Sequence, residues 1–600
     1  MKLSRLAELP TSRYTIDVFG GYNHNLRIGE GEFYEMKNLT SDDYPILSPR
    51  HQRGTYNVIT PENPCALIAK DALCYIDIVT ENNAYGAKLY INGNENAVEG
   101  LKLSSLKADL PKTLVSMGSY VIIMPDKKWV NTNDDTYGNI EATVTTKTDV
   151  TFTPCKLDGT DFSNDKVTIK DEAPASPNDL DYWIDTSTIP HTLKQYSATS
   201  AMWVSVATTY IKISATDIGV PFDTGDGVTI SGIEAEALAD LNTTMVVQGR
   251  GDNYIIVIGI IDETKTQKTP ITVSRKMPNM DFIIESENRL WGCRYGLSVD
   301  NEFVNEIYAS KLGDFKNWNS FQGISTDSYA VSLGTDGPFT GAITHIGYPI
   351  FFKENYMHKI YGNYPANYQI QTTACRGVQK GCSKSLAIVN EILYYKSRSA
   401  ICTYDGSLPV EISSALGDVV YSDAVAGVLR NKYYISMRDV NETDPSKLYH
   451  LFVYDTQKGM WHKEDNTQVR DFCNCDGELY YIDVDTKAIK TVRGTGLTDT
   501  KPIKWEAITG IIGTESPDKK YLSRIVLRGT LEVGTTLYLQ AQYDSSGTWE
   551  QVFSMSAATL KTFSIPVRPR RCDHLRLRFI GQGEAKIFSI TKTFEQGSDM

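Results

Sequence analysis

One kind of short aromatic strand recurs four times in this chain, as Pro349-Ile-Phe-Phe-Lys353, Ile392-Leu-Tyr-Tyr-Lys396, Lys432-Tyr-Tyr-Ile-Ser436 and Leu479-Tyr-Tyr-Ile-Asp483. The starts of these runs are 43, 40 and 47 residues apart, and each of the first three is followed by a second short run. A repeat of roughly 40 to 50 residues with several short strands is typical of a β-propeller, whose blades cannot bury both faces alone and stack around an axis. The alternative interpretation is a chain of ordinary β-hairpins.

The repeat is interrupted between Lys147 and Met280, and the last hundred residues change character again. Short strand-like runs on both sides of the interruption fit further blades, whereas segments such as Thr536–Gln542 alternate apolar and polar residues as half-buried strands do. The sequence therefore predicts an all-β fold: a β-propeller with an inserted β-barrel or sandwich-like domain and a C-terminal β-sandwich. The expected units are residues 1–146 (N-terminal segment and first blades), 147–280 (inserted β-domain), 281–500 (remaining blades) and 501–600 (sandwich).

Composition limits the kinds of partner. The 600 residues carry a net charge of -13, which argues against tight, non-specific nucleic-acid binding but suits a wall that DNA slides past. The 35 Tyr residues favour half-exposed strands and interfaces. No apolar run approaches the roughly 18 residues that span a bilayer, and Met1–Pro10 lacks a signal-peptide core, so we expect a soluble chain made in a cytoplasm and not inserted in a membrane.

The sequence contains no recognisable catalytic constellation. It has no HExxH, P-loop or GxSxG motif, and its eight His residues are scattered. The ten Cys residues show no zinc-ligand spacing and are expected to be free, buried thiols. We therefore expect a protein that is not an enzyme and has no cofactor and no bound metal.

Two groups of residues are candidates for binding. A basic segment near the C-terminus would suit a protein interface with an acidic neighbour, although a solvated strand face is the simpler explanation. Its members are Arg568, Arg570, Arg571, Arg576 and Arg578. Aromatic side chains in the inserted domain would suit a glycan platform, namely Tyr182, Trp183 and Trp203.

Ordered motifs along the chain resemble those of phage tail β-propeller structural proteins, the tail hub or nozzle-like proteins of short-tailed phages. The N-terminal motifs are Gly20-Gly-Tyr-Asn23, Ile28-Gly-Glu-Gly-Glu32, Met36-Lys-Asn38 and Asp43-Tyr-Pro-Ile-Leu-Ser-Pro-Arg50. Others are Gly225–Gly232, Arg275–Glu285, Asn288–Gly292, Ile307–Asp314, Trp318, Phe352–Asn355, Lys359–Gly362, Gly377-Val378, Tyr404–Gly406 and Arg576–Gly583. Each motif is weak alone, and it is their order that makes the resemblance specific.

The resemblance implies a structural virion protein of a phage tail or neck. Its expected role is a ring, nozzle or hub around the DNA exit channel, formed by a homo-oligomer of six subunits. The expected partners are portal, adaptor or other tail proteins, with viral DNA passing through without specific binding. The main alternative is a distal tail or baseplate protein that binds a host receptor or glycan. A further alternative is an enzyme, chiefly a wall or glycan hydrolase.

Overall fold

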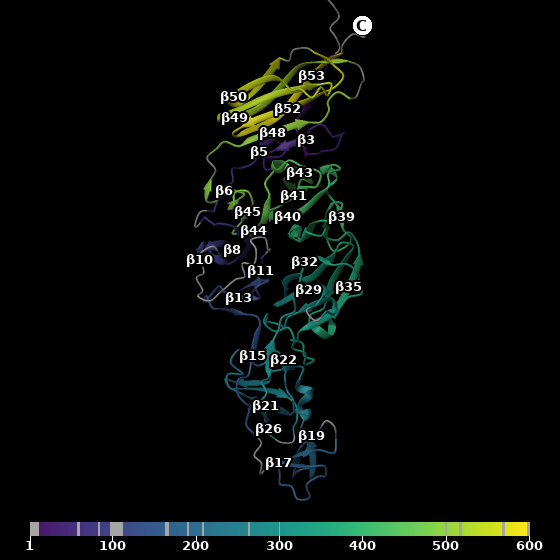
Figure 1. Ribbon diagram of the computed structural model, residues 1–600. Helices are drawn as coiled ribbons and strands as arrows, with labels where there is room; N and C mark the ends of the chain where they lie inside the picture. The colour runs from purple at the N-terminus through teal and green to yellow at the C-terminus, as the bar shows by residue number, and fades with distance from the viewer. Residues whose placement is uncertain are drawn as a thin grey trace, which may run out of the picture.

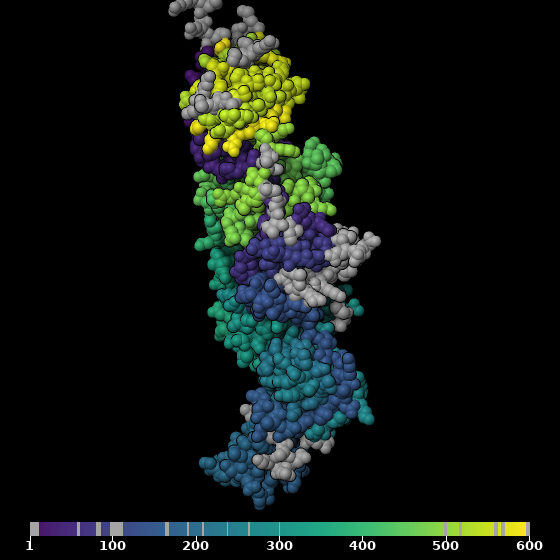
Figure 2. All heavy atoms as spheres, turned by 90° about the vertical axis from the view of Figure 1, so that its left-hand side faces the viewer, coloured from purple at the N-terminus to yellow at the C-terminus, as the bar shows by residue number. Residues whose placement is uncertain are grey.

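The computed structural model describes the chain except for residues 1–10, 57–59, 82–83, 96–111, 162–166, 189–190, 207–208, 262–263, 299–300, 499–500, 515–518, 567–569 and 597–600. Strands make up 55% of the structure and helices 3%, which confirms the predicted all-β class. Three parts are stacked along one long axis: a C-terminal sheet region, a middle body and a group of inserted sheets (Figure 1). The side view has the same elongated outline (Figure 2). No helix among the described residues has the length and hydropathy to cross a membrane.

The middle body consists of seven successive groups of strands, here called sheets 1 to 7. Sheet 1 is β7 (Pro64–Lys70), β8 (Ala72–Glu81), β9 (Ala84–Ile91) and β10 (Asn94–Glu95). Sheet 2 is β11 (Thr113–Met117), β12 (Tyr120–Met124), β13 (Lys128–Asn131) and β14 (Tyr137–Asn139). Sheet 3 is β28 (Phe282–Ser286), β29 (Arg289–Leu297), β30 (Phe303–Ala309) and β31 (Tyr329–Ser332). Sheet 4 is β32 (Phe339–His345), β33 (Tyr348–Lys353), β34 (Tyr356–Tyr361) and β35 (Gln369–Ala374).

The remaining groups close the series. Sheet 5 is β36 (Ala387–Val389), β37 (Ile392–Lys396), β38 (Ile401–Tyr404) and β39 (Val410–Glu411). Sheet 6 is β40 (Tyr421–Leu429), β41 (Lys432–Asp439), β42 (Tyr449–Asp455) and β43 (Met460–Asp465). Sheet 7 is β44 (Val469–Cys475), β45 (Glu478–Asp483), β46 (Ala488–Thr491) and β47 (Leu497–Thr498), with β6 (Gly54–Thr55) between β46 and β47. Short 3-10 turns lie between strands at η2 (Pro365–Asn367), η3 (Ser383–Ser385), η4 (Ser414–Leu416) and η5 (Pro445–Lys447).

Each of these sheets contacts the next, in a propeller-like arrangement. The contacts join first strands: β7 to β11, β11 to β28, β28 to β32, β36 to β40, β40 to β44 and β44 to β7, while η3 links sheets 4 and 5. Sheet 7 therefore meets sheet 1, and its strand β6 comes from the N-terminal part of the chain, paired through Thr55 to Lys490 of β46.

The four aromatic runs that mark the repeat are the second strands of sheets 4 to 7. They are β33, β37, β41 and β45, and most of their residues are buried. A strand enclosed on both faces by neighbouring sheets needs apolar side chains at consecutive positions rather than at alternate ones. This explains why runs such as Ile-Phe-Phe and Leu-Tyr-Tyr recur with the period of the sheets.

Residues 142–275 form three sheets of their own between sheets 2 and 3. The first is β15 (Ala142–Thr145), β27 (Thr272–Arg275), β22 (Gly227–Ser231) and β23 (Thr244–Val246). The 3-10 turn η1 (Glu236–Leu241) lies between β22 and β23 of this sheet. The second is β24 (Gly249–Gly251), β25 (Tyr254–Ile258), β21 (Tyr210–Ser214), β16 (Val150–Cys155) and β26 (Lys265–Gln267). The third, here called the tip sheet, is β17 (Val167–Lys170), β18 (Tyr182–Asp185), β19 (Thr192–Ser197) and β20 (Met202–Ser205). The first two sheets share a buried core that is separate from the other cores.

The C-terminal region combines the two ends of the chain. Its strands are β48 (Lys504–Thr509), β49 (Lys520–Tyr543), β50 (Glu550–Pro566), β51 (Arg571–Cys572), β52 (Leu575–Gln582) and β53 (Ala585–Gln596), joined by β1 (Thr11–Ile16), β2 (Gly21–Tyr22) and β3 (Glu32–Lys37). The small pair β4 (Leu39–Thr40) and β5 (Ser48–Pro49) follows β3. Residues 11–37 of the predicted first unit therefore lie in the C-terminal sheet, because β1 pairs with β53 and β3 pairs with β48, both near the other end of the chain.

This sheet continues without a break into the middle body. β2 pairs with β43 of sheet 6 at Tyr22 and Trp461, and with β3 on its other side. The hydrogen-bonded order therefore runs from β1 at one edge of the C-terminal region to β40 in sheet 6.

Candidate functional site

The three aromatic residues expected to form a glycan platform lie on the tip sheet, at the end of the molecule opposite the C-terminal region (Figure 1). Trp183 and Trp203 are in edge contact, with ring centroids 5.5 Å apart, and Tyr196 lies 5.3 Å from Trp203. Tyr182 precedes Trp183 in the same strand, so its side chain points to the opposite face of the sheet.

The structure therefore corrects the platform expectation. Trp183 is only 5% exposed, and the Lys194 ammonium lies 4.6 Å from its ring centroid. Lys194 is itself held by Asp185 at 2.7 Å. Stacking on a sugar needs an open ring face, and this ring is covered by neighbouring side chains. Among the described aromatic side chains on that face, the half-buried Trp203 and Tyr196 remain partly accessible.

The opposite face of the tip sheet is apolar and partly open. Ile184 and Leu193 are buried there, while Ile169, Met202 and Val204 are 42%, 62% and 52% exposed. Sequence reasoning missed this face, although the alternation of Met202 and Val204 with Trp203 was a usable signal.

The basic segment lies in the C-terminal region, and two of its arginines form ion pairs. Arg578 donates to Glu506 at 2.7 Å, and Arg570 forms an ion pair with Glu550. Arg576 lies over the Tyr34 ring, with its guanidinium carbon 4.6 Å from the centroid.

Arg571 is half-buried in β51, and Arg568 lies outside the described residues. The alternating burial of β52 places Arg576 and Arg578 on its less buried face, opposite Leu577 and Phe579. The segment is thus a paired strand face rather than an open basic stripe.

A cavity of about 900 Å³ opens between sheets 4, 5 and 6, beside the N-terminal segment. Its charged lining residues are Glu354, Arg376, Lys396, Arg398, Glu411 and Asp418. Lys396 is 3% exposed and donates to Gln379 and to the Ser397 carbonyl, and its burial lowers the pKa of its ammonium. Arg376 pairs with Glu411 at 3.0 Å. The residues come from turns of three sheets, so no local motif in the sequence could have indicated the cavity.

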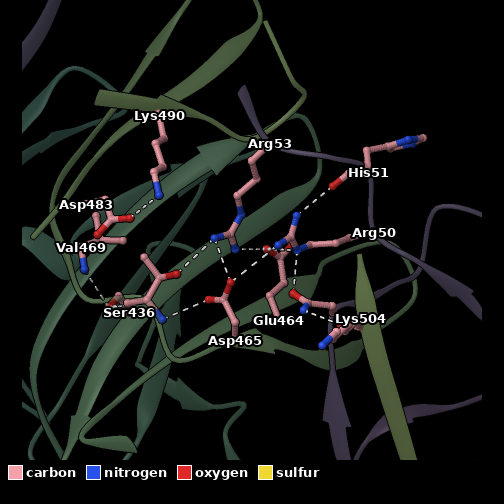
Figure 3. A network of polar contacts seen from close by, with 12 residues as sticks. Arg50, His51, Arg53, Ser436, Glu464, Asp465, Val469, Asp483, Lys490 and Lys504 are labelled. Carbon is pink, nitrogen blue, oxygen red and sulfur yellow. Dashed lines mark hydrogen bonds and ion pairs between the residues drawn. The ribbon is translucent and has the colours of Figure 1, made fainter. Parts of the chain in front are cut away.

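A buried polar network joins the N-terminal segment to sheets 6 and 7 (Figure 3). Arg53, 8% exposed, contacts Glu464 at 2.6 Å and Asp465 at 2.9 Å, while Arg50 lies 3.7 Å from both carboxylates. Burial alone would raise the pKa of Asp465, but Arg53 and Arg50 outweigh it and hold that pKa at about 2. The network fixes the chain just before β6 and so stabilises the position at which β6 pairs with the other strands of sheet 7.

The cysteine and metal chemistry of the described residues is limited. They hold no group of three or more His, Cys, Asp or Glu residues placed to bind a metal ion. All ten cysteines are free, and nine are buried. Burial raises the pKa of Cys375, in the cavity wall, to about 11, which keeps the thiol protonated at neutral pH.

No protein-family model and no curated protein matches the sequence. Solved structures that resemble the chain include the exo-β-1,3-galactanase of Phanerochaete chrysosporium, at 9% identity and a TM-score of 0.21, covering 52% of this chain and 94% of that one. The acylaminoacyl peptidase of Pyrococcus horikoshii has 10% identity and a TM-score of 0.25, covering 70% and 49%. A family 43 arabinoxylan arabinofuranohydrolase of Bacillus subtilis has 8% identity and a TM-score of 0.18, covering 52% and 95%.

These three similar structures are enzymes, which contradicts the expectation from the sequence that the chain is not an enzyme. That expectation is withdrawn. At TM-scores of 0.18 to 0.25 the likeness assigns no reaction, substrate or catalytic residue to this chain. None of the three is a phage protein, so the resemblance to phage tail propeller proteins stays a prediction.

Proposed function

We propose that this chain is a structural subunit of a phage tail or neck, and that its copies form a ring, as a nozzle or hub around the DNA exit channel. Six copies are proposed for the ring, in contact with portal, adaptor or other tail proteins. Its location would then be the virion, with viral DNA passing through the ring without specific binding. The net charge of -13 supports this passage, because an acidic surface repels the phosphates of a moving duplex.

The proposed architecture is a closed propeller of seven blades, sheets 1 to 7, with residues 142–275 as an inserted β-domain and the C-terminal region as a β-sandwich. Contacts between successive first strands, including β44 with β7, support closure. Sheet 7 takes its strand β6 from the N-terminal segment. This also supports closure, since propellers protect their edges by completing the ring of blades.

One observation carries the proposal: the hydrogen-bonded sheet that runs from the C-terminal region into sheet 6. A subunit that bears load in a tail must transmit force between its parts without hinging. Pairing of Tyr22 with Trp461 joins the two parts through backbone hydrogen bonds rather than through a flexible linker. The elongated outline in Figure 2 agrees with a subunit that contacts different neighbours at its two ends.

The experiment is electron cryo-microscopy of particles of the phage that encodes this chain, after binding of an antibody fragment raised against residues 142–275. We expect the fragment to decorate a ring at the portal-proximal tail or neck, at one site per subunit. A second fragment against residues 501–600 should decorate a ring at a different axial height. Labelling confined to fibre tips would contradict the proposal.

A second candidate function, a distal tail or baseplate protein that binds a host receptor or glycan, is favoured by the exposed side chains of the tip sheet. Met202 is 62% exposed, and Trp203 is half-buried beside Tyr196. Host cells would be incubated with the purified chain and with its Trp203→Ala variant. Retention of the chain by cells and its loss in the variant, with Tyr364→Ala as a matched surface control, would support this second function.

A further inference from the structure

Two strand edges in the C-terminal region have no pairing partner among the described residues. β1 pairs only with β53, and β50 pairs only with β49. Both edges belong to one four-stranded part of the sheet, because residues Arg524–Leu531 of β49 pair with β53 on one side and with β50 on the other. Thr15 and Ser564 even lie in one row, through Thr591 and Val526.

The two edges run in opposite directions. All three pairings in the order β1, β53, β49 and β50 are antiparallel. An even number of antiparallel strands gives a sheet whose first and last strands point oppositely. A second copy placed beside the first in the same orientation therefore presents its β1 antiparallel to this β50, and antiparallel ladders are the more stable kind.

The composition of β50 is typical of a strand that pairs with neighbours along both of its edges. The run Gln551–Leu560 contains no charged residue, proline or glycine, and Lys561 is the only charged residue between Glu550 and the end of the strand. Natural proteins usually protect a long free edge with charges, proline, bulges or a covering loop, because a long uncharged edge pairs with other chains. The 17 residues of β50 have a proline only at their end, although register shifts beside Leu531 and Gln540 interrupt their pairing with β49.

Among the described residues, β1 is hydrogen-bonded to another strand along one edge only, and its other edge has no partner strand. Its first five residues are exposed, including Tyr14 at 41%, although they are hydrogen-bonded to β53 in register. Six residues in a strand span about 20 Å, long enough for a specific backbone ladder.

We propose that copies of this chain join head to tail, by antiparallel pairing of β1 of one copy with β50 of the next. Because the two edges are different surfaces of one subunit, the contact is heterologous, and a fixed rotation between copies generates either a closed ring or an open filament. That the contact closes into a ring rests on the proposed function. The occupant of the β50 edge is a second copy of this chain.

The first test compares two truncations of the purified full chain by light scattering coupled to size exclusion, across a concentration series. Deleting residues 1–10 leaves β1 in place and should leave oligomers as in the unchanged chain. Deleting residues 1–15 removes most of β1 and should reduce the mass to that of the monomer, 66.9 kDa for the full chain. Circular dichroism and the melting temperature verify that both truncations fold.

The second test locates the contact. A benzophenone amino acid replaces Tyr14, and light-induced cross-links are mapped by mass spectrometry. We expect dimer-sized products that join position 14 to the peptide of residues 550–566. The same probe at Tyr364, which is 43% exposed in the middle body, is the control and should not capture that peptide.

The possible outcomes distinguish failure of the proposed β1–β50 contact from failure of the proposed ring. Oligomers that persist without β1, or cross-links from position 14 only to other peptides, overturn the proposed contact and leave the ring proposal standing. Cross-links to residues 550–566 within a monomer-sized band also overturn it, since the edge is then covered by the same copy. Filaments joined through residues 550–566 support the contact while contradicting the ring.

Discussion

Two buried histidines, His358 and His462, and the half-buried His450 make the folded chain sensitive to mild acid. Burial lowers the pKa of His462 from its usual 6.5 to about 3, and those of His358 and His450 to about 4. In the unfolded chain these rings take up protons near pH 6.5, whereas the folded chain keeps them neutral. Their contribution is therefore fully present above pH 6.5 and is lost as the pH falls toward the folded pKa values.

For His462 alone, this linkage amounts to about 2 kcal/mol of stability lost between pH 7 and pH 5. We expect the melting temperature to fall over this range, and to fall less steeply in the His462→Asn variant, whose side chain does not titrate. Differential scanning fluorimetry at half-unit pH steps measures both slopes. His51→Asn, the same change at an exposed position, is the matched control for the substitution itself. Equal slopes for the unchanged chain and His462→Asn would show that the lowered pKa of His462 does not cause the loss of stability in acid.

Gly377 belongs to one of the motifs that indicated the family resemblance, and the structure gives a steric reason for it. A Cβ atom at this position would lie 1.8 Å from the backbone carbonyl oxygen of Lys353, which cannot rotate away as a side chain could. We expect Gly377→Ala to cost about 1–3 kcal/mol of unfolding free energy through forced backbone movement.

The matched control is Gly334→Ala, because a Cβ atom there meets nothing within 4 Å and the backbone is not in the left-handed region. It should change stability by less than about 0.5 kcal/mol. Chemical denaturation monitored by tryptophan fluorescence compares the two variants. A Gly377→Ala variant as stable as Gly334→Ala would mean that the segment after β35 relaxes freely.

At the scale of elements, the inserted sheets enter and leave the middle body at one place. Ala142 pairs with Arg275, so Glu141 and Lys276 are neighbours at the root of the insertion. The buried Arg275–Asp226 ion pair lies wholly inside the inserted part, which also has its own apolar core. The polar contacts that cross the root gather at two places: Lys311 and Asn317 donate to the Gly225 carbonyl and Asn317 accepts from the Gly227 amide, while Arg275 donates to the Ile140 carbonyl.

We therefore expect that replacing residues 142–275 by a Gly-Ser-Gly linker leaves a folded, soluble middle body. The isolated segment 142–275 should fold as well. Removal of residues 113–139 is the contrasting variant: it deletes sheet 2 from between its neighbours and should abolish folding. Circular dichroism and solubility after expression decide between these outcomes. Aggregation of the chain without 142–275, together with an unfolded isolated segment, would contradict the separation.

Elements with a local signal could be predicted from the sequence, and elements with distant partners could not. The second strands of sheets 4 to 7 were visible because enclosure on both faces imposes consecutive apolar residues with a fixed period. The pairing of Thr11 with Glu595 left no such trace, since neither segment carries information on its partner. Tyr182 and Trp183 were grouped because they are adjacent in sequence, yet adjacency in a strand places side chains on opposite faces. The cavity beside Lys396 depends on turns of three sheets and became visible only in the folded chain.

At the scale of the whole molecule, two kinds of connection hold the three parts together. The C-terminal region and sheet 6 share one hydrogen-bonded sheet, and the Arg53 network fixes the segment between them against sheets 6 and 7 (Figure 3). The inserted sheets are joined to the middle body mainly through their root. Cooperativity of unfolding should follow this difference, because parts that share a buried core and a backbone ladder cannot separate without exposing both.

We therefore expect two thermal transitions rather than three. One belongs to residues 142–275, and the other covers the middle body and the C-terminal region together. Calorimetry of the full chain tests this, and the variant that lacks residues 142–275 should show the second transition alone. Arg53→Met would leave the buried Glu464 and the half-buried Asp465 without their closest cation. We expect it to reduce the stability of the part that unfolds in the second transition by about 3–5 kcal/mol while leaving the first transition in place. Lys586→Met, which breaks the more exposed pair with Asp43, is the control and should cost less than about 1 kcal/mol. A separate third transition that hydrogen exchange assigns to residues 501–600 would show that the shared sheet does not couple the two parts, and would weaken the case for a rigid tail subunit.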